Sequence, residues 1–166
     1  MSVGQRVSTD HQLARLLQIG VVLEEVVEAR AARHYESLSS EERDELHEDV
    51  RDLLSEAREE SAEHRERLEA LIDELDADTV PFEDVEALVG EQFAGTGPDD
   101  FDGILYDQLH GEETAYKFYD DLIQAVEASD ASFDLDRERL LSTLESIREE
   151  EAEGVEEVTE IMEESA

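Results

Sequence analysis

Four side chains that can bind a metal ion interrupt rows of apolar residues that recur with helical spacing. They are Glu28, His64, Glu112 and Glu151. An ionised carboxylate inside a helical core costs several kcal/mol unless a partner compensates its charge. Carboxylate oxygens and imidazole nitrogens are also suitable ligands for iron or manganese. We therefore expect the four side chains to meet in one layer of a helical bundle, as a shared polar group or as a metal site.

Further polar residues lie close to these four along the sequence. Glu24 comes one helical turn before Glu28 and is an additional ligand candidate. Tyr35 and Tyr119 each follow a candidate glutamate by seven residues, which places them two turns further along the same helical face. We interpret the two tyrosines as packing residues whose hydroxyl groups support the polar layer, and redox chemistry is the alternative role.

Other glutamates with similar spacing are predicted to face solvent. Glu60 precedes Glu63 by three residues, and Glu150 precedes Glu153 by the same interval. Most residues seven positions before or after these glutamates are charged or polar. Such a row on a helix is typical of a solvated face. We therefore leave these four glutamates out of the expected metal site.

Apolar residues recur at intervals of three and four over four long stretches, which predicts four helices. The stretches cover about residues 9–38, 41–75, 100–128 and 136–164. Ser39 and Glu42 form a capping-box pattern at the start of the second stretch. Residues 129–134 are rich in turn-forming types and separate the third stretch from the fourth.

These elements predict an all-α protein with a single domain, a four-helix bundle made of two hairpins and a long crossover. The domain covers 1–166, the hairpins about 9–75 and 100–164, and the crossover about 76–99. At 1.5 Å per residue, a reversal at Ser39 would leave Glu28 much closer to the turn than residue 61. If the polar layer forms, the first hairpin should therefore reverse nearer residues 42–46.

The composition narrows the classes of function. Of 166 residues, 49 are Asp or Glu and 13 are Lys or Arg, so the formal net charge is -36. Such a field repels phosphate backbones and anionic lipids, which disfavours nucleic acid and membrane surfaces as partners. The absence of cysteine excludes disulfides and thiolate metal sites. Lysine occurs only at Lys117. An excess of acidic residues with few lysines indicates a halophilic cytoplasm. Molar salt there shortens the Debye length to about 3 Å, so a dense acidic surface no longer repels itself.

In these residues and their spacing the chain resembles the ferritin-like superfamily, in particular its rubrerythrin-type members. The di-iron site of that family takes a Glu from each of two helices and a Glu-x-x-His from each of the other two. By this resemblance, Glu28 and Glu112 match the two single glutamates. His64 matches the histidine of the first motif, and Glu151 matches the glutamate of the second. Ser61 and Gly154 stand at the two remaining ligand positions. The resemblance therefore implies a degenerate ligand set, sufficient for one metal ion or a loosened pair.

The resemblance leads to two hypotheses about function. The first is a protein that binds non-haem iron or another hard divalent ion such as manganese. The resemblance implies ferroxidase, peroxide-scavenging or iron-handling activity, and the implied enzyme class is a di-iron oxidoreductase. Because the chain has no cysteine for a rubredoxin-type module, such an enzyme would need a separate redox partner. The second is a metal-free, degenerate ferritin-like domain that dimerises or binds a partner. Apolar residues outside the inner rows, among them Leu16, Leu23 and Val27, favour a homodimer.

Overall fold

The computed structural model describes residues 7–37, 41, 48–75 and 101–164, and this part of the chain contains long α-helices and no strand. The helices are α1 (Asp10–Ser37), α3 (Glu48–Glu74), α5 (Phe101–Ala128) and α6 (Arg137–Glu164). They confirm the predicted all-α four-helix bundle. The capping box predicted at Ser39 and Glu42 and the crossover predicted at 76–99 lie outside the described residues. None of these helices has a stretch long and apolar enough to cross a membrane.

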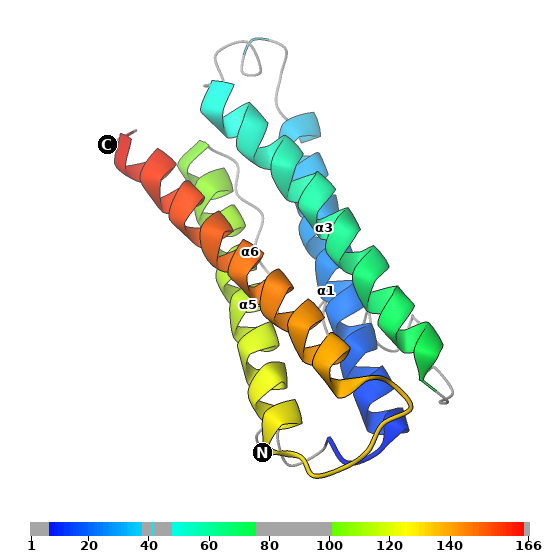
Figure 1. Ribbon diagram of the computed structural model, residues 1–166. Coiled ribbons are helices and arrows are strands. Elements are labelled where there is room, and N and C mark those ends of the chain that lie inside the picture. The colour runs from blue at the N-terminus through cyan, green and yellow to red at the C-terminus, as the bar shows by residue number, and fades with distance from the viewer. Residues whose placement is uncertain (1–6, 38–40, 42–47, 76–100, 165–166) are drawn as a thin grey trace.

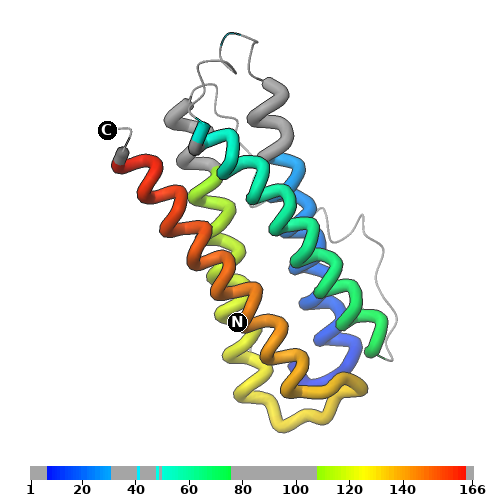
Figure 2. Tube along the Cα trace, turned by 45° about the horizontal axis from the view of Figure 1, so that its top comes forward, coloured from blue at the N-terminus to red at the C-terminus, as the bar shows by residue number. Residues whose placement is uncertain are grey.

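The helices form two antiparallel pairs that lie side by side (Figure 1). α1 packs along α3 and α5 packs along α6, and the contacts between the pairs, α1 with α5 and α3 with α6, are sparser. Figure 2 shows the same two pairs from a second direction. In Figure 1 α1 and α6 run upward, whereas α3 and α5 run downward. The last helix of the first hairpin is thus parallel to the first helix of the second, as expected for hairpins joined by a long crossover.

Two apolar clusters fill the interior of the bundle, and a layer of polar side chains separates them. The larger cluster takes buried residues from all four helices, among them Leu17, Leu68, Leu122 and Leu144. The smaller cluster lies toward the start of α3 and the end of α6 and contains Val50, Leu53, Leu54, Val158 and Ile161. The helical positions between the two clusters carry the buried polar residues Glu24, Ser61, His64, Glu112 and Glu151. α3 and α6 are therefore apolar on both sides of one polar level.

Hydrogen bonds tie the N-terminal segment to residues 129–136, which connect α5 to α6 at one end of the bundle. The Ser129 hydroxyl donates to the carbonyl oxygen of Val7 over 2.6 Å. The backbone N–H of Asp134 donates to Oδ1 of Asp10 over 3.2 Å. The predicted turn between the third and fourth helices is confirmed, and its contacts with the start of α1 join the two hairpins at this end.

Replacing Leu144 by alanine tests the contribution of the larger cluster to stability. The Leu144 side chain is completely buried, so truncation loses its burial and leaves a cavity. We expect the free energy of unfolding to fall by about 2–5 kcal/mol, measured by denaturant titration with circular dichroism. Ser142→Ala, at an exposed position of the same helix, is the control and should change stability by less than about 0.5 kcal/mol. Equal losses in the two variants would contradict this assignment of the core.

Candidate metal centre

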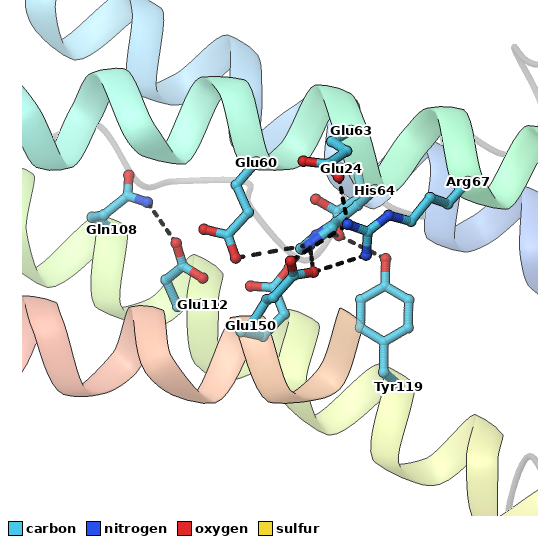
Figure 3. A network of polar contacts seen from close by, with 10 residues as sticks. Glu24, Glu60, Glu63, His64, Arg67, Gln108, Glu112, Tyr119 and Glu150 are labelled. Atoms are coloured by element: carbon cyan, nitrogen blue, oxygen red, sulfur yellow. Dashed lines mark hydrogen bonds and ion pairs between the residues drawn. The ribbon is translucent and has the colours of Figure 1, made fainter. Parts of the chain in front are cut away.

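The polar layer brings together side chains from all four helices near the middle of the bundle (Figure 3). Glu24 comes from α1, His64 from α3, Glu112 from α5 and Glu151 from α6, and each is at most 4% exposed. Three of the four residues expected in this layer, His64, Glu112 and Glu151, are therefore buried at one level. The remaining helix, α1, contributes Glu24, the additional ligand candidate, in place of Glu28.

The imidazole of His64 is surrounded by carboxylates on both of its nitrogens. Nδ1 lies 3.3 Å from Oε1 of Glu24 and 3.1 Å from Oε1 of Glu151. Nε2 lies 2.9 Å from Oε2 of Glu150 and 3.8 Å from Oε1 of Glu60. A neutral imidazole has only one N–H to donate, so carboxylates on both sides favour the doubly protonated ring. Burial alone would lower the pKa of His64, but the hydrogen bonds and charges of these glutamates raise it to about 8.

Glu24 lies deepest in the layer and keeps one oxygen atom without a partner. Its Oε1 accepts a 2.6 Å hydrogen bond from the hydroxyl of Tyr119, whose side chain is completely buried. Its Oε2 is buried and accepts no hydrogen bond. Burial and the nearby charge of Glu24 raise the pKa of Tyr119, so the phenol remains protonated and donates. A buried carboxylate oxygen without a hydrogen-bond partner is a group that calls for a further donor or a cation.

Glu112 occupies space that exists because residue 154 is glycine. A Cβ atom added at Gly154 would come within 2.7 Å of Oε2 and 2.9 Å of Cδ of Glu112. On its other side, the Glu112 carboxylate accepts a 3.1 Å hydrogen bond from Nε2 of Gln108. Burial raises the pKa of Glu112, and burial together with the charge of Glu24 raises that of Glu151 well above the usual range. The position where the family resemblance led us to expect a histidine is thus filled by a carboxylate from the neighbouring helix.

A second group of carboxylates reaches the outer nitrogen of His64 from the edge of the bundle. The side chains of Glu60 and Glu150 are 30% and 33% exposed. Arg67 donates to Oε2 of Glu150 over 2.9 Å. Burial, the charge of Glu112 and other nearby carboxylates raise the pKa of Glu60 to about 8 although His64 opposes the shift. The expectation that these two glutamates face only solvent was therefore wrong.

Glu28 lies outside the buried layer, which corrects its expected position. Its side chain is 28% exposed, and its Oε2 accepts a 3.0 Å hydrogen bond from Nη1 of Arg65. Glu28 is one turn beyond Glu24, which moves it about 6 Å along α1 and about 40° around the helix axis. That rotation turns it from the bundle interior to the seam between α1 and α3. Tyr35 is in the last part of α1, where side chains lie outside the described residues.

Ser61 is buried in the layer at the position where the resemblance predicts a glutamate. It lies one turn before His64 on α3, so the first motif supplies one strong ligand instead of two. The buried carboxylate of Glu24 approaches the same histidine from α1. The facing residues 24 and 64 are equally far along the chain from residue 44, which agrees with a reversal near 42–46. That segment itself lies outside the described residues.

Two sets of possible ligands share His64. One is the buried set of Glu24, His64 and Glu151, and the other is the edge set of Glu60, His64 and Glu150. In each set one ligand atom from every residue lies within 4.8 Å of the others. Comparison of the chain with family models, with curated proteins and with solved structures gives no match. Function therefore has to be inferred from these side chains and their chemistry.

Gly154→Ala tests the close approach of Glu112 to α6. Alanine is favoured over glycine inside a helix by about 1 kcal/mol, but the added methyl group would push the Glu112 carboxylate aside. We therefore expect a net loss of up to about 1 kcal/mol of stability in denaturant titrations. Glu112→Ala removes the overlapping group, so Gly154→Ala should cost less in that background. A double-mutant cycle measures this coupling. Strict additivity of the two changes would show that residues 112 and 154 do not compete for space.

The stability of the metal-free protein is expected to fall as the pH rises from about 6 to about 9. The pKa of Glu60 is raised from 4.5 to about 8, and that of His64 from 6.5 to about 8. Between the unfolded and the folded pKa values the folded state therefore binds more protons than the unfolded state. The stabilisation is fully present below the unfolded values and is lost as the pH rises through about 8. Ordinary surface carboxylates are already ionised in this window.

Denaturant titrations after chelation, at constant molar salt, measure this pH dependence. We expect a decrease of at least about 1 kcal/mol between the two limits. Glu60→Gln serves as the comparison because it removes one of the groups with a raised pKa, and its pH dependence should be shallower. Stability that stays constant or rises over the window would contradict the protonated state of the cluster.

Proposed function

We propose that the buried layer binds a hard divalent metal ion, iron or manganese, through Glu24, His64 and Glu151. The observation that carries the proposal is the unpaired, buried Oε2 of Glu24. Three buried carboxylates, including Glu112, accompany a single histidine, so the layer holds more negative charge than its own residues can balance. Oxygen and imidazole donors within a few ångströms of one another are the ligands that such ions accept.

The fold supports a ferritin-like interpretation of this site. Two antiparallel hairpins with α3 parallel to α5 present one cluster midway along the bundle. The family likewise builds its di-iron site in the bundle core from side chains on facing helices. Iron bound there would supply ferroxidase, peroxide-scavenging or iron-handling chemistry. The chain's own residues would hold the ion and exclude bulk water, and Tyr119 would orient Glu24 through its 2.6 Å hydrogen bond.

The geometry favours one ion over a pair. Ser61 offers a hydroxyl where the resemblance predicts a carboxylate, and Gly154 offers no ligand. The space beside Gly154 is taken by the carboxylate of Glu112, within 2.7 Å of where a Cβ atom would lie. A side chain able to hold a second ion from that position would therefore displace Glu112. We propose that Glu112 completes the set from the far side of Glu151.

A metal-free domain that dimerises or binds a partner is the second candidate function. The observation in its favour is that His64 as an imidazolium already faces carboxylates on both nitrogens. Protonation of Glu112 and Glu151, whose pKa values are raised by burial, would remove much of the remaining charge. In this case the layer acts as a buried polar network that fixes the register of the four helices.

Elemental analysis of protein purified without chelator separates the two functions. We expect about one iron or manganese ion per chain, because the buried set offers one cage of donor atoms. A Glu24→Gln, Glu151→Gln double variant keeps the shape of both side chains but removes two charged ligands, and it should lose the metal. Asp120→Asn is the control, since Asp120 pairs with Arg148 at 2.7 Å away from the layer. Protein that is metal-free and takes up none after aerobic addition of ferrous ion would leave only the second function.

A further inference from the structure

The proposed metal ligands are too deeply buried for an ion to reach them directly from solvent. Glu24, His64 and Glu151 are each at most 4% exposed. The contacts of His64 lead outward in one direction, through its Nε2 to Glu150 and Glu60. These two side chains are about one third exposed. They are therefore in contact both with solvent and with the buried group.

The imidazole ring lies between an inner and an outer set of possible ligands, as Figure 3 shows for the labelled residues. The inner set, on the Nδ1 side, contains Glu24 with its unpaired oxygen. The outer set contains the two partly exposed glutamates, and the donor atoms of each set lie within 4.8 Å of one another. An ion held by the outer set would have only the width of one imidazole ring to cross before it met the inner carboxylates, whose nearest oxygens lie 3.1 Å and 3.3 Å from Nδ1.

The outer set lies at the seam between α3 and α6, one of the two seams where helices from different hairpins make sparser contacts. Next to it the seam widens into a surface hollow of about 340 Å³ whose lining includes Arg67. The lining from α6 is made of small hydroxyl residues, Ser142, Thr143 and Ser146, apart from Arg139. Solvent therefore comes close to the Arg67 end of this seam without any movement of the helices.

Arg67 forms hydrogen bonds with the carboxylate of Glu150 that would compete with a metal ion. Its guanidinium donates to both oxygens of this carboxylate, over 2.9 Å and 3.4 Å, and also to Glu63. A carboxylate held on both oxygens by a guanidinium is less available to another cation. The side chains of Arg67 and Glu150 are 29% and 33% exposed, so solvent and salt weaken the pair enough for it to open.

We propose that Glu60 and Glu150 form the port through which the metal ion enters the buried site, with Arg67 as a latch on Glu150. The inference rests on the proposed function, because it assumes that the buried layer binds a metal. The ion is first held by the two outer carboxylates and then passes His64 to the ligands on the inner side. The port thus changes how fast the site fills and empties, and the inner ligands determine how tightly the ion is held.

Loading kinetics with cobalt(II), followed by its visible absorption in a stopped-flow instrument, test the port. In a Glu60→Gln, Glu150→Gln double variant we expect loading to slow roughly tenfold. Release to excess chelator should slow by the same factor, because a port lies on the path in both directions, so the dissociation constant should be unchanged. Arg67→Gln should load about threefold faster, since it frees Glu150 from a competing cation. Molar salt throughout limits the long-range effect of charge changes.

Asp120→Asn and Arg148→Gln are matched controls for these variants. Their side chains are 30% and 31% exposed and form an ion pair at the seam between α5 and α6, so they repeat the charge, burial and pairing of the port residues elsewhere. Both controls should load at the native rate. Native rates in the port variants, or equal slowing in the controls, would overturn the port. A weaker dissociation constant with unchanged loading would overturn it too, by making Glu60 and Glu150 permanent ligands. Native protein that binds no cobalt would instead refute the metal site itself.

Discussion

The burial of three carboxylates beside a single imidazole is the constraint on which the arrangement of this bundle depends. Water is excluded at that level by apolar clusters on both sides, so each charge must find its partner within the protein. His64 takes the central position because it alone in the layer can donate from two sides. Tyr119 and Gln108 donate to the carboxylates of Glu24 and Glu112. The rotation of each helix is thereby limited to the orientation that brings its polar residue to this level.

Four arginines of this acidic chain lie where helices meet. Arg65 on α3 reaches Glu28 on α1, and Arg148 on α6 reaches Asp120 on α5. The seam between α3 and α6 has two such pairs, Arg67 with Glu150 and Arg139 with Glu74. Each pair contributes little alone because it is partly exposed. Together they supply positive charge along seams that would otherwise bring acidic surfaces into contact.

The helices and part of the site could be predicted from the sequence because both depend on local periodicity. The expected ends of the third and fourth helices lie within one residue of those observed. His64, Glu112 and Glu151 could be recognised because a polar residue in an apolar row is conspicuous. Glu24 and Glu28 lie one turn apart on the same side of α1. Only the packing of α1 against α3 determines which of them is buried.

The outer carboxylates were missed for a related reason. Glu60 and Glu150 have charged or polar neighbours in the sequence, and a helical wheel places them near solvent, where about one third of each side chain does lie. Their contacts with His64 depend on how closely α3 approaches α6, which no single-helix pattern contains. A local signal did exist for Glu60, which precedes His64 by four residues and so lies on the same face one turn away.

The close approach of Glu112 to Gly154 limits which pairs of residues can occupy these two positions, which lie 42 residues apart in the sequence. A larger residue at 154 is compatible with this packing only if the carboxylate at 112 has been shortened or turned away. A histidine at 154 is therefore incompatible with Glu112 in its observed position. A variant with a shortened side chain at 112 would make room for a larger residue at 154, and it would carry one buried carboxylate fewer.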